Sequence, residues 1–205
     1  IMIDTLEAQR NDAAQLSIDR ILEKNRIAEA GSRSAQSHYA LLTMHRPSNV
    51  DDKETLEPII RFLLDEVCVD MPLIWPIHPR ARKRLEEFGL WEDVATDKNM
   101  FLLEPVGYHE MLRLNIGAAL MLTDSGGLQE ECCVLGTPCM TLRWNTERPV
   151  TLKEHGGASI LVGNKVENLR SAYKELREHP RKPQRPALWD GQTSERIVEI
   201  LAAKE

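Results

Sequence analysis

The sequence lacks the features that mark membrane proteins and secreted proteins. No stretch approaches the roughly 20 consecutive apolar residues that a membrane-spanning helix needs. The first residues also lack the basic-then-apolar layout of a signal peptide. We therefore expect a cytoplasmic protein without a membrane partner.

Cysteine is scarce, and neither sign of charge gathers into long runs. The four cysteines show no CxxC spacing and three lie in apolar segments, so we interpret them as small core residues. Lys and Arg number 26 against 32 Asp and Glu, and the formal net charge of −6 argues against a nucleic-acid-binding surface. No HExxH or Cys/His set predicts a metal site, and no GxSxG pattern predicts a nucleophile.

The composition that remains is typical of a folded domain. The 205 residues, 42% of them hydrophobic and 28% charged, suffice for one large domain, or for one domain with a terminal extension. The chain opens with Ile1 rather than an initiator methionine, and no strand pattern precedes its first helix. We therefore expect a part of a longer polypeptide.

Short, continuous apolar runs alternate with amphipathic segments along most of the chain. Such runs are typical of parallel strands covered on both faces, and six of them predict strands at 38–44, 73–77, 101–104, 118–123, 139–142 and 159–162. Helix patterns fall at 11–30, from 51 onward, and at 80–88, 109–115, 127–135, 147–155, 166–178 and from about Ser194. The alternation predicts an α/β fold, a single Rossmann-like doubly wound parallel sheet with a C-terminal helical tail. Ligands of such sheets bind beyond the carboxyl ends of the strands.

The segment TDSGGLQEE at 123–131 follows one of these strands directly. Gly126 and Gly127 allow a tight turn that presents backbone N–H groups at a helix N-terminus, where phosphate binds favourably. Ser125 adds a hydroxyl donor, and Glu131, one helical turn past Gly127, is placed to accept two ribose hydroxyls. An ordinary strand-to-helix turn, in which the acidic residues only favour the positive helix end, explains the same pattern.

Four further polar turns follow the other strands. His45 and Arg46 come after the first strand, and His78 comes after the second, between two prolines. Tyr108 follows the third strand, where its ring is suited to contact a base, and Arg148 follows the fifth, near a helix start that suits a phosphate. Each turn alone is also explained without a ligand, by a loop histidine, a core tyrosine or a capped helix. Together, five such turns at the ends of five successive strands indicate a binding site. No pair of carboxylates is placed as an acid/base couple, so we interpret the site as incomplete within this chain.

Six segments, in this order and spacing, resemble the non-hydrolysing UDP-N-acetylglucosamine 2-epimerases over essentially the whole chain. The segments are TMHRPSNVDD, PIHPR, EPVGYHEMLRL, TDSGGLQEE, TERP and WDG-x-x-x-ERI. Members of that family have two Rossmann-like domains that face a cleft, as in GT-B glycosyltransferases, and this sequence resembles only the second, UDP-binding domain. The resemblance implies an interdomain connection and leading helix at 1–36, the UDP-binding domain at 37–180, and a C-terminal crossing segment and helix at 181–205.

The resemblance also implies the reaction of the intact protein. The family interconverts UDP-GlcNAc and UDP-ManNAc by eliminating UDP across C1 and C2, which leaves a 2-acetamidoglucal, and by adding UDP back after reprotonation on the opposite face. It needs no nicotinamide, and we expect neither a cofactor nor a metal. The proton-transferring carboxylates belong to the first domain, so this chain alone is expected to be inactive. The expected partners are UDP, UDP-GlcNAc, the missing N-terminal domain and, when intact, a second copy in a homodimer.

The resemblance assigns roles residue by residue. His45 matches the active-site histidine. The matched UDP contacts are Ser125, Gly126 and Gly127 on the diphosphate, Glu131 on the ribose, the Tyr108 region on the uracil and Arg148 near the phosphates.

Two further positions match a second site. Arg46 and His78 match positions at which a second UDP-GlcNAc regulates bacterial members of the family. Ser48 stands where many members carry a glutamate, a departure that bears on closure of the cleft.

Three other functions fit the same residues. One is a hydrolysing relative that releases ManNAc, and another is a GT-B glycosyltransferase that passes the sugar to an acceptor. The third is a stand-alone nucleotide-binding module without catalysis.

Overall fold

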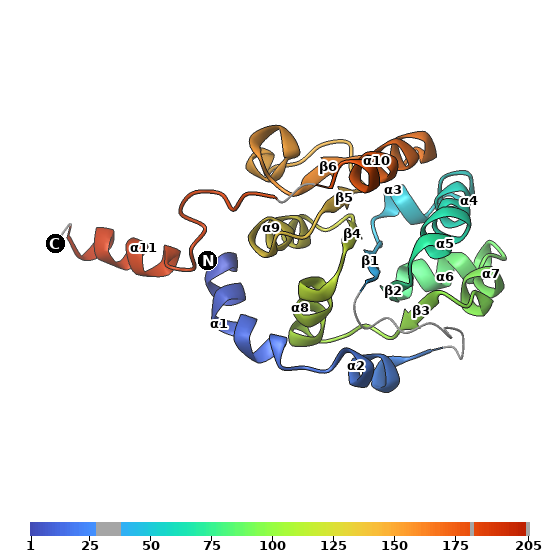
Figure 1. Cartoon of the computed structure of the whole chain (residues 1–205), viewed down its shortest axis with the longest axis horizontal. Coiled ribbons are helices and arrows are strands. Elements are labelled where there is room, and N and C mark those ends of the chain that lie inside the picture. The colour runs from blue at the N-terminus through green and yellow to red at the C-terminus, as the bar shows by residue number, and fades with distance from the viewer. Residues whose placement is uncertain (28–37, 181–182, 204–205) are drawn as a thin grey trace.

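A computed structural model describes residues 1–27, 38–180 and 183–203 of the chain. Six parallel strands form one sheet in the order β3-β2-β1-β4-β5-β6, with helices on both faces (Figure 1). The strands are β1 Ala40–Thr43, β2 Leu73–Pro76, β3 Met100–Leu103, β4 Leu120–Thr123, β5 Cys139–Thr141 and β6 Ser159–Leu161. All six predicted strands are confirmed, and the sheet is the doubly wound one that the alternation predicts.

Helices precede, connect and follow these strands. The α-helices are α1 Met2–Ala14, α2 Ile18–Asn25, α3 Pro47–Val50, α4 Lys53–Phe62, α5 Cys68–Asp70, α6 Pro79–Glu87, α7 Trp91–Thr96, α8 Tyr108–Gly117, α9 Gly126–Leu135, α10 Val166–Glu178 and α11 Thr193–Ala202. A π-helical turn, η1 Leu63–Val67, continues α4, and two 3-10 turns, η2 Pro149–Thr151 and η3 Lys153–His155, precede β6. Within the described ranges no helix is both long and apolar enough to cross a membrane.

The helix predicted at 11–30 is wrong in its extent. α1 begins at Met2 and ends at Ala14, and α2 begins only at Ile18. The break falls at Ser17, whose hydroxyl accepts a hydrogen bond from the Arg20 N–H at 3.4 Å and so caps a new helix. Residues 28–30 of the predicted helix lie outside the described part of the chain.

The helix predicted at 147–155 is also wrong. This segment holds η2 and η3, separated by Leu152 in an extended conformation. The Thr151 hydroxyl donates to the carbonyl of Arg148 at 2.7 Å, and the Arg148 N–H donates to the Thr146 hydroxyl at 3.1 Å. Side chains thus bond the backbone groups that an α-helix needs for its own ladder.

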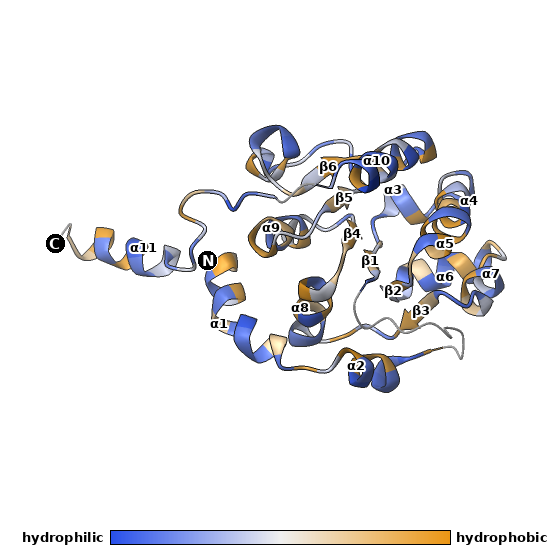
Figure 2. Ribbon diagram, in the orientation of Figure 1, coloured by the Kyte–Doolittle hydropathy of each residue, from blue (hydrophilic) through white to orange (hydrophobic). Residues whose placement is uncertain are grey.

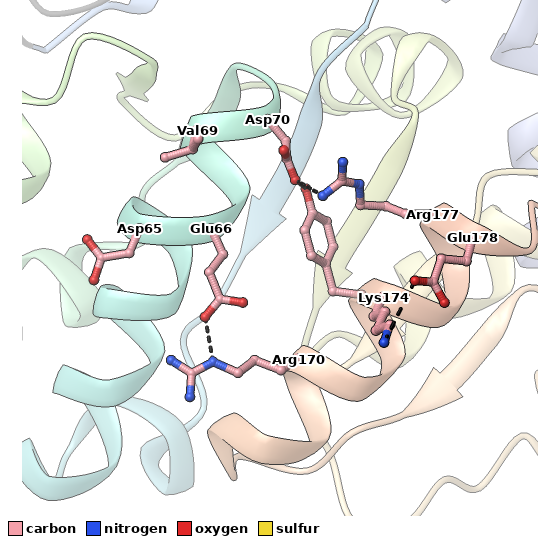
Figure 3. Close-up of a pocket in the computed structure, with 9 residues that line it drawn as sticks. Asp65, Glu66, Val69, Asp70, Arg170, Lys174, Arg177 and Glu178 are labelled. Carbon is pink, nitrogen blue, oxygen red and sulfur yellow. Dashed lines mark hydrogen bonds and ion pairs between the residues drawn. The ribbon is translucent and has the colours of Figure 1, made fainter.

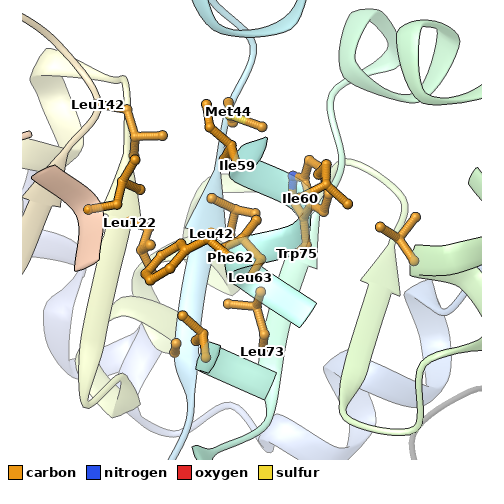
Figure 4. Packing of buried hydrophobic residues seen from close by; sticks show 14 of the residues in the cluster. Leu42, Met44, Ile59, Ile60, Phe62, Leu63, Leu73, Trp75, Leu122 and Leu142 are labelled. Atoms are coloured by element: carbon orange, nitrogen blue, oxygen red, sulfur yellow. The ribbon is translucent and has the colours of Figure 1, made fainter. Parts of the chain in front are cut away.

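Alternate strand residues point to opposite faces of the sheet, and both faces are covered. Leu42 and Leu122 belong to a large cluster with residues of α4 and η1 (Figure 4). Their strand neighbours Leu41 and Met121 belong to a second cluster, with residues of α2, α8 and α9. This period of two in fully buried strands follows from the pleat. The four cysteines are buried and form no disulfide, as the sequence predicts.

The direction in which successive strands are added to the sheet reverses between the neighbouring strands β1 and β4. β2 and β3 lie on the far side of β1, whereas β5 and β6 lie on the far side of β4. Doubly wound sheets bind their ligands at such a reversal, beyond the carboxyl ends of the two strands. The register sets Thr43 opposite Thr123, and their hydroxyls lie 2.7 Å apart. The residues that follow β1 and β4 therefore meet.

The two terminal helices meet near their N-terminal ends. α1 packs against α8 and α9 through a small cluster that includes Ile3 and Leu6. The Asp4 carboxylate accepts hydrogen bonds from the N–H groups of Thr193 at 3.2 Å and Ser194 at 2.7 Å. The start of α11 is therefore tied to α1.

Beyond this tie, α11 projects away from the sheet (Figure 1). Figure 2 shows apolar residues along it, and none of its residues is buried. Its exposed large apolar side chains are Ile197, Val198, Ile200 and Leu201.

Candidate functional site

The carboxyl ends of β1 and β4 bring His45 and Asp124 together. Asp124 directly follows β4 and is fully buried, and His45 follows β1 by two residues. Nδ1 of His45 faces Oδ1 of Asp124 at 3.0 Å. The contact lacks hydrogen-bond geometry, since Oδ1 of Asp124 has no hydrogen-bond partner among the described residues. Because an ionised carboxylate has no proton to give, this close approach favours the tautomer with the proton on Nδ1. Nε2 of the neutral ring, on its far side, therefore carries a lone pair.

Three further donors hold the carboxylate of Asp124. Its Oδ2 accepts from the backbone N–H groups of His45 and Arg46 at 2.9 and 2.8 Å, and from the Asn49 amide at 3.1 Å. Nε of Arg46 also donates to the backbone carbonyl of Asp124 at 2.8 Å. Buried Asn49 reaches the Leu142 carbonyl at 3.0 Å as well. These bonds offset the cost of burying a charge and join the turns after β1, β4 and β5.

His78 lies beside His45, with ring centroids 5.2 Å apart. It is the N-cap of α6, and its Nδ1 accepts a hydrogen bond from the Arg80 N–H at 3.1 Å. Nδ1 of His78 therefore bears no proton, and Nε2 of its neutral ring is a donor. The two neighbouring rings thus carry opposite tautomers, an acceptor at His45 Nε2 and a donor at His78 Nε2.

Helix α9 begins directly after this pair, with Ser125 as its N-cap. The Gln129 N–H donates to the Ser125 carbonyl at 3.2 Å, so Gly126 and Gly127 lie in the first turn, whose N–H groups have no intrahelical acceptor. The Ser125 side chain makes no capping hydrogen bond. The N–H groups, the hydroxyl and the helix dipole together suit an anionic ligand.

Two arginines lie over this helix start. A Cβ added at Gly126 would lie 2.6 Å from Nη1 of Arg148 and 3.4 Å from Nη1 of Arg143. Nε of Arg148 pairs with Glu130 at 2.6 Å, and Nη2 of Arg143, a side chain only 5% exposed, pairs with Glu147 at 2.7 Å. The hydrogen bond from Arg143 lowers the pKa of Glu147 to about 2. A glycine at 126 leaves room for guanidinium groups beside the N-terminus of α9.

Glu131 lies one turn further along α9 and is only 7% exposed. Burial raises the pKa of its carboxyl to about 7, and the neighbouring Asn115 and Tyr108 offset part of that rise. Its Oε2 has no hydrogen-bond partner among the described residues. Burial and the nearby Glu131 in turn raise the pKa of Tyr108 to about 12. A buried carboxylate oxygen without a donor is suited to accept hydroxyl groups from a ligand.

The predicted site residues fall into three groups at one edge of the sheet. His45, Arg46 and His78 gather around or beside Asp124. Arg148 lies against the start of α9, which Ser125, Gly126 and Gly127 form. The third group is the Glu131 and Tyr108 pair. The roles of these residues stay predictions.

Three residues of this edge were missed from the sequence: Asp124, Gln129 and Arg143. Asp124 and Gln129 belong to the TDSGGLQEE segment, but their partners lie in other turns, 79 residues away at His45 and 22 residues away at Thr151. Only the place of Asp124 directly after a strand, where ligand-facing residues collect, signals its importance.

A hollow of about 480 Å³ lies elsewhere, between η1, α5 and α10 (Figure 3). α5 immediately precedes β2, so this hollow lies at the edge of the sheet where strands begin. Three ion pairs line it: Glu66 with Arg170, Asp70 with Arg177, and Lys174 with Glu178. In the part of the chain that the structure describes, no group of three His, Cys, Asp or Glu side chains is arranged to hold a metal ion.

Known proteins match both the sequence and the fold. The model of the UDP-N-acetylglucosamine 2-epimerase family matches residues 1–202. The UDP-N-acetylglucosamine 2-epimerase of Methanocaldococcus jannaschii is 44% identical over 185 residues, which cover 89% of this chain and 50% of that protein. The UDP-2,3-diacetamido-2,3-dideoxy-D-glucuronate 2-epimerase of Pseudomonas aeruginosa is 36% identical over 177 residues, 82% of this chain and 46% of that protein.

A solved structure agrees with these matches. The Methanocaldococcus jannaschii UDP-GlcNAc 2-epimerase in complex with UDP-GlcNAc and UDP superposes with a TM-score of 0.82 at 38% identity, over 98% of this chain and 53% of that one. The chain thus spans about half the length of the relatives that it matches. By sequence and by fold, the chain belongs to the UDP-N-acetylglucosamine 2-epimerase family.

Proposed function

We propose that this chain is the UDP-binding half of an enzyme that interconverts UDP-GlcNAc and UDP-ManNAc. The observation that carries the proposal is the His45 and Asp124 pair directly before the anion-attracting start of α9. The Methanocaldococcus jannaschii relative, which was solved with UDP-GlcNAc and UDP, supports the same ligands here.

The first part of the proposal concerns binding. The diphosphate lies against the N–H groups of Gly126 and Gly127, the Ser125 hydroxyl and the Arg148 guanidinium. Buried Glu131 accepts the ribose hydroxyls through Oε2, and Tyr108 lies against the uracil. The helix dipole and the guanidinium stabilise the negative charge that grows on UDP as it departs.

The second part concerns the reaction. A base removes the C2 proton while the bond between C1 and the diphosphate oxygen breaks, which yields UDP and a 2-acetamidoglucal. Return of the proton to the opposite face of C2 and of the diphosphate oxygen to C1 completes the inversion. In this step His45 has first taken up a proton from solvent at Nε2. The carboxylate of Asp124 stabilises the charged ring, and Nε2 then donates a hydrogen bond to the departing diphosphate.

The base is proposed to lie outside this chain, in a preceding domain. The relatives are about twice as long as this chain, which supports that arrangement. Within it, 37–180 is the UDP-binding domain. The segment 1–36 is the interdomain connection and leading helix, and 181–205 is the C-terminal crossing segment and helix. The tie between Asp4 and α11, and the exposed apolar residues of α11, suit a pair of segments that reach a second domain together.

Three finer assignments stay predictions. Arg46 and His78 are proposed to contact a regulatory UDP-GlcNAc, which would then lie close to His45. The intact protein is proposed to be a cytoplasmic homodimer. Light scattering of the complete protein and fractionation of its cells test those two properties.

Turnover of UDP-GlcNAc by the complete polypeptide in heavy water tests the reaction. We expect deuterium at C2 of UDP-ManNAc, and unlabelled product overturns the mechanism. Free ManNAc as the main product supports the hydrolysing alternative, and turnover that requires an added acceptor supports a glycosyltransferase. The 205-residue chain alone should bind UDP without turning over substrate. A folded chain that fails to bind UDP at millimolar concentration overturns the site.

A further inference from the structure

The turn that carries Arg148 is held by side chains as well as by a backbone hydrogen bond, which the Thr151 N–H donates to the Arg148 carbonyl at 3.0 Å. Arg148 has φ −127° and ψ 63°, between β5 and η2. Its N–H donates to the Thr146 hydroxyl at 3.1 Å, and its carbonyl accepts from the Thr151 hydroxyl at 2.7 Å. Two threonine hydroxyls therefore hold both backbone polar groups of this one residue.

Both hydroxyls converge on a single carboxamide of α9. The Thr146 hydroxyl donates to Oε1 of Gln129 at 3.0 Å, and Nε2 of Gln129 donates to the Thr151 hydroxyl at 2.6 Å. Each hydroxyl thus donates one bond and accepts one. Exchanging the amide oxygen and nitrogen of Gln129 would break this pattern of donors and acceptors. The hydrogen bonds therefore agree with only one orientation of the Gln129 carboxamide.

Gln129 itself is fully buried, so it acts on a ligand only through the groups that it holds. It lies three residues after Gly126 on the same helix, and the Arg148 guanidinium lies over Gly126. One short helix therefore supplies the N–H groups for an anion and also braces the turn that brings the cation to them.

We propose that Gln129 is a positioning residue that places the Arg148 guanidinium over the first turn of α9, for the diphosphate of the ligand. This role rests on the proposed function, in which Arg148 meets that diphosphate. A cation held in advance stabilises phosphate charge without reorganisation, and a displacement of about 1 Å is costly.

The competing explanation is that Gln129 only joins a turn to a helix and stabilises the fold. The two explanations differ in which ligand is affected. A positioning role changes the affinity for UDP but not for uridine, because uridine has no phosphate for Arg148 to meet. A loss of stability alone affects both ligands alike.

The test compares Gln129→Met, Thr146→Val and Thr146→Ser in the 205-residue chain by calorimetry. Methionine keeps the length of glutamine but makes neither bond, and serine restores the hydroxyl that valine removes. We expect UDP affinity to fall about tenfold in Gln129→Met and Thr146→Val, with uridine affinity unchanged and recovery in Thr146→Ser. Equal losses for UDP and uridine, or no loss for UDP, overturn the positioning role.

Thr137→Val is the matched control. It removes a buried hydroxyl bond, to the Asn115 carbonyl at 3.2 Å, after the other end of α9. This substitution should lower the stability of the fold, because a buried hydrogen bond is lost. The preference for UDP over uridine should stay unchanged.

A readout without ligand separates this inference from the proposed function. Hydrogen exchange of the Arg148 amide should accelerate in Gln129→Met but not in Thr137→Val. Only Gln129→Met releases the Thr146 hydroxyl, which accepts the hydrogen bond from the Arg148 N–H. Unchanged exchange overturns the brace whatever the chain binds. If the wild-type chain binds UDP no better than uridine, the diphosphate site fails, and Gln129 then has no ligand to position.

Discussion

Nδ1 of His45 and Oδ1 of Asp124 lie 3.0 Å apart, although 79 residues separate them in sequence. Three N–H donors bind the other carboxylate oxygen, so an asparagine at 124 would keep its carbonyl there and turn its NH₂ group toward His45. Nδ1 of His45 would then have to accept, which moves its proton to Nε2. The pair thus sets the tautomer of the proposed active-site histidine.

Asp124→Asn is expected to reduce kcat of the complete enzyme by roughly 10²–10⁴-fold, because a neutral amide does not stabilise the protonated ring of His45 as the carboxylate does. UDP affinity should change little, because the start of α9 is untouched. Steady-state kinetics with calorimetry for UDP measures both quantities. A variant with wild-type kcat contradicts the role of the pair.

Glu131→Gln should stabilise the fold at high pH. Burial raises the Glu131 pKa from 4.5 to about 7, so the folded state binds more protons than the unfolded state between these values. Stability therefore falls as pH rises through this window, by up to about 3 kcal/mol, and stays low above it. Urea unfolding should show the variant more stable near pH 8, with the difference disappearing toward pH 4.5. A difference that does not vary with pH contradicts this prediction.

The same carboxyl should make nucleoside binding depend on pH. Ribose hydroxyls donate hydrogen bonds, and the ionised carboxylate accepts them more strongly than the neutral acid does. Uridine affinity of the chain should therefore rise as pH increases through about 7, the pKa of Glu131. Titrations at several pH values should give a flat profile for Glu131→Gln. A pH-dependent profile in that variant assigns the effect to another group.

Gly126→Ala should weaken UDP binding without unfolding the chain. The new Cβ would lie 2.6 Å from Nη1 of Arg148, and the flexible guanidinium must move away. Loss of a charge-assisted contact lowers UDP affinity by roughly tenfold or more, while stability stays within about 1 kcal/mol because alanine favours a helix.

Gly136→Ala is the control for this change. Gly136 has φ +80° and open space around its Cβ position, so alanine costs about 1 kcal/mol in backbone strain. UDP affinity should not change, because Gly136 follows the far end of α9. Equal UDP affinities in the two variants contradict the Arg148 contact.

Much of the fold was predictable because its signals are local. Six short apolar runs mark the strands, since a parallel strand with both faces covered needs no polar face. Two helices were mispredicted because polar side chains took over backbone groups, Ser17 by capping α2 and Thr151 by bonding the Arg148 carbonyl. Such competition depends on the exact geometry of a side chain, and hydrophobic periodicity does not record it.

The α/β alternation and the polar turns after the strands follow from the amino-acid sequence alone, because periodicity and turn residues act over a few positions. Which turns meet depends on the folded sheet, since β1 and β4 become neighbours through the strand order of the whole sheet. That adjacency buries Asp124 against His45. Burial in the same fold shifts the Glu131 pKa, and packing onto α9 lets Gln129 brace Arg148. Desolvation and hydrogen bonds between distant segments exist only once the chain is folded.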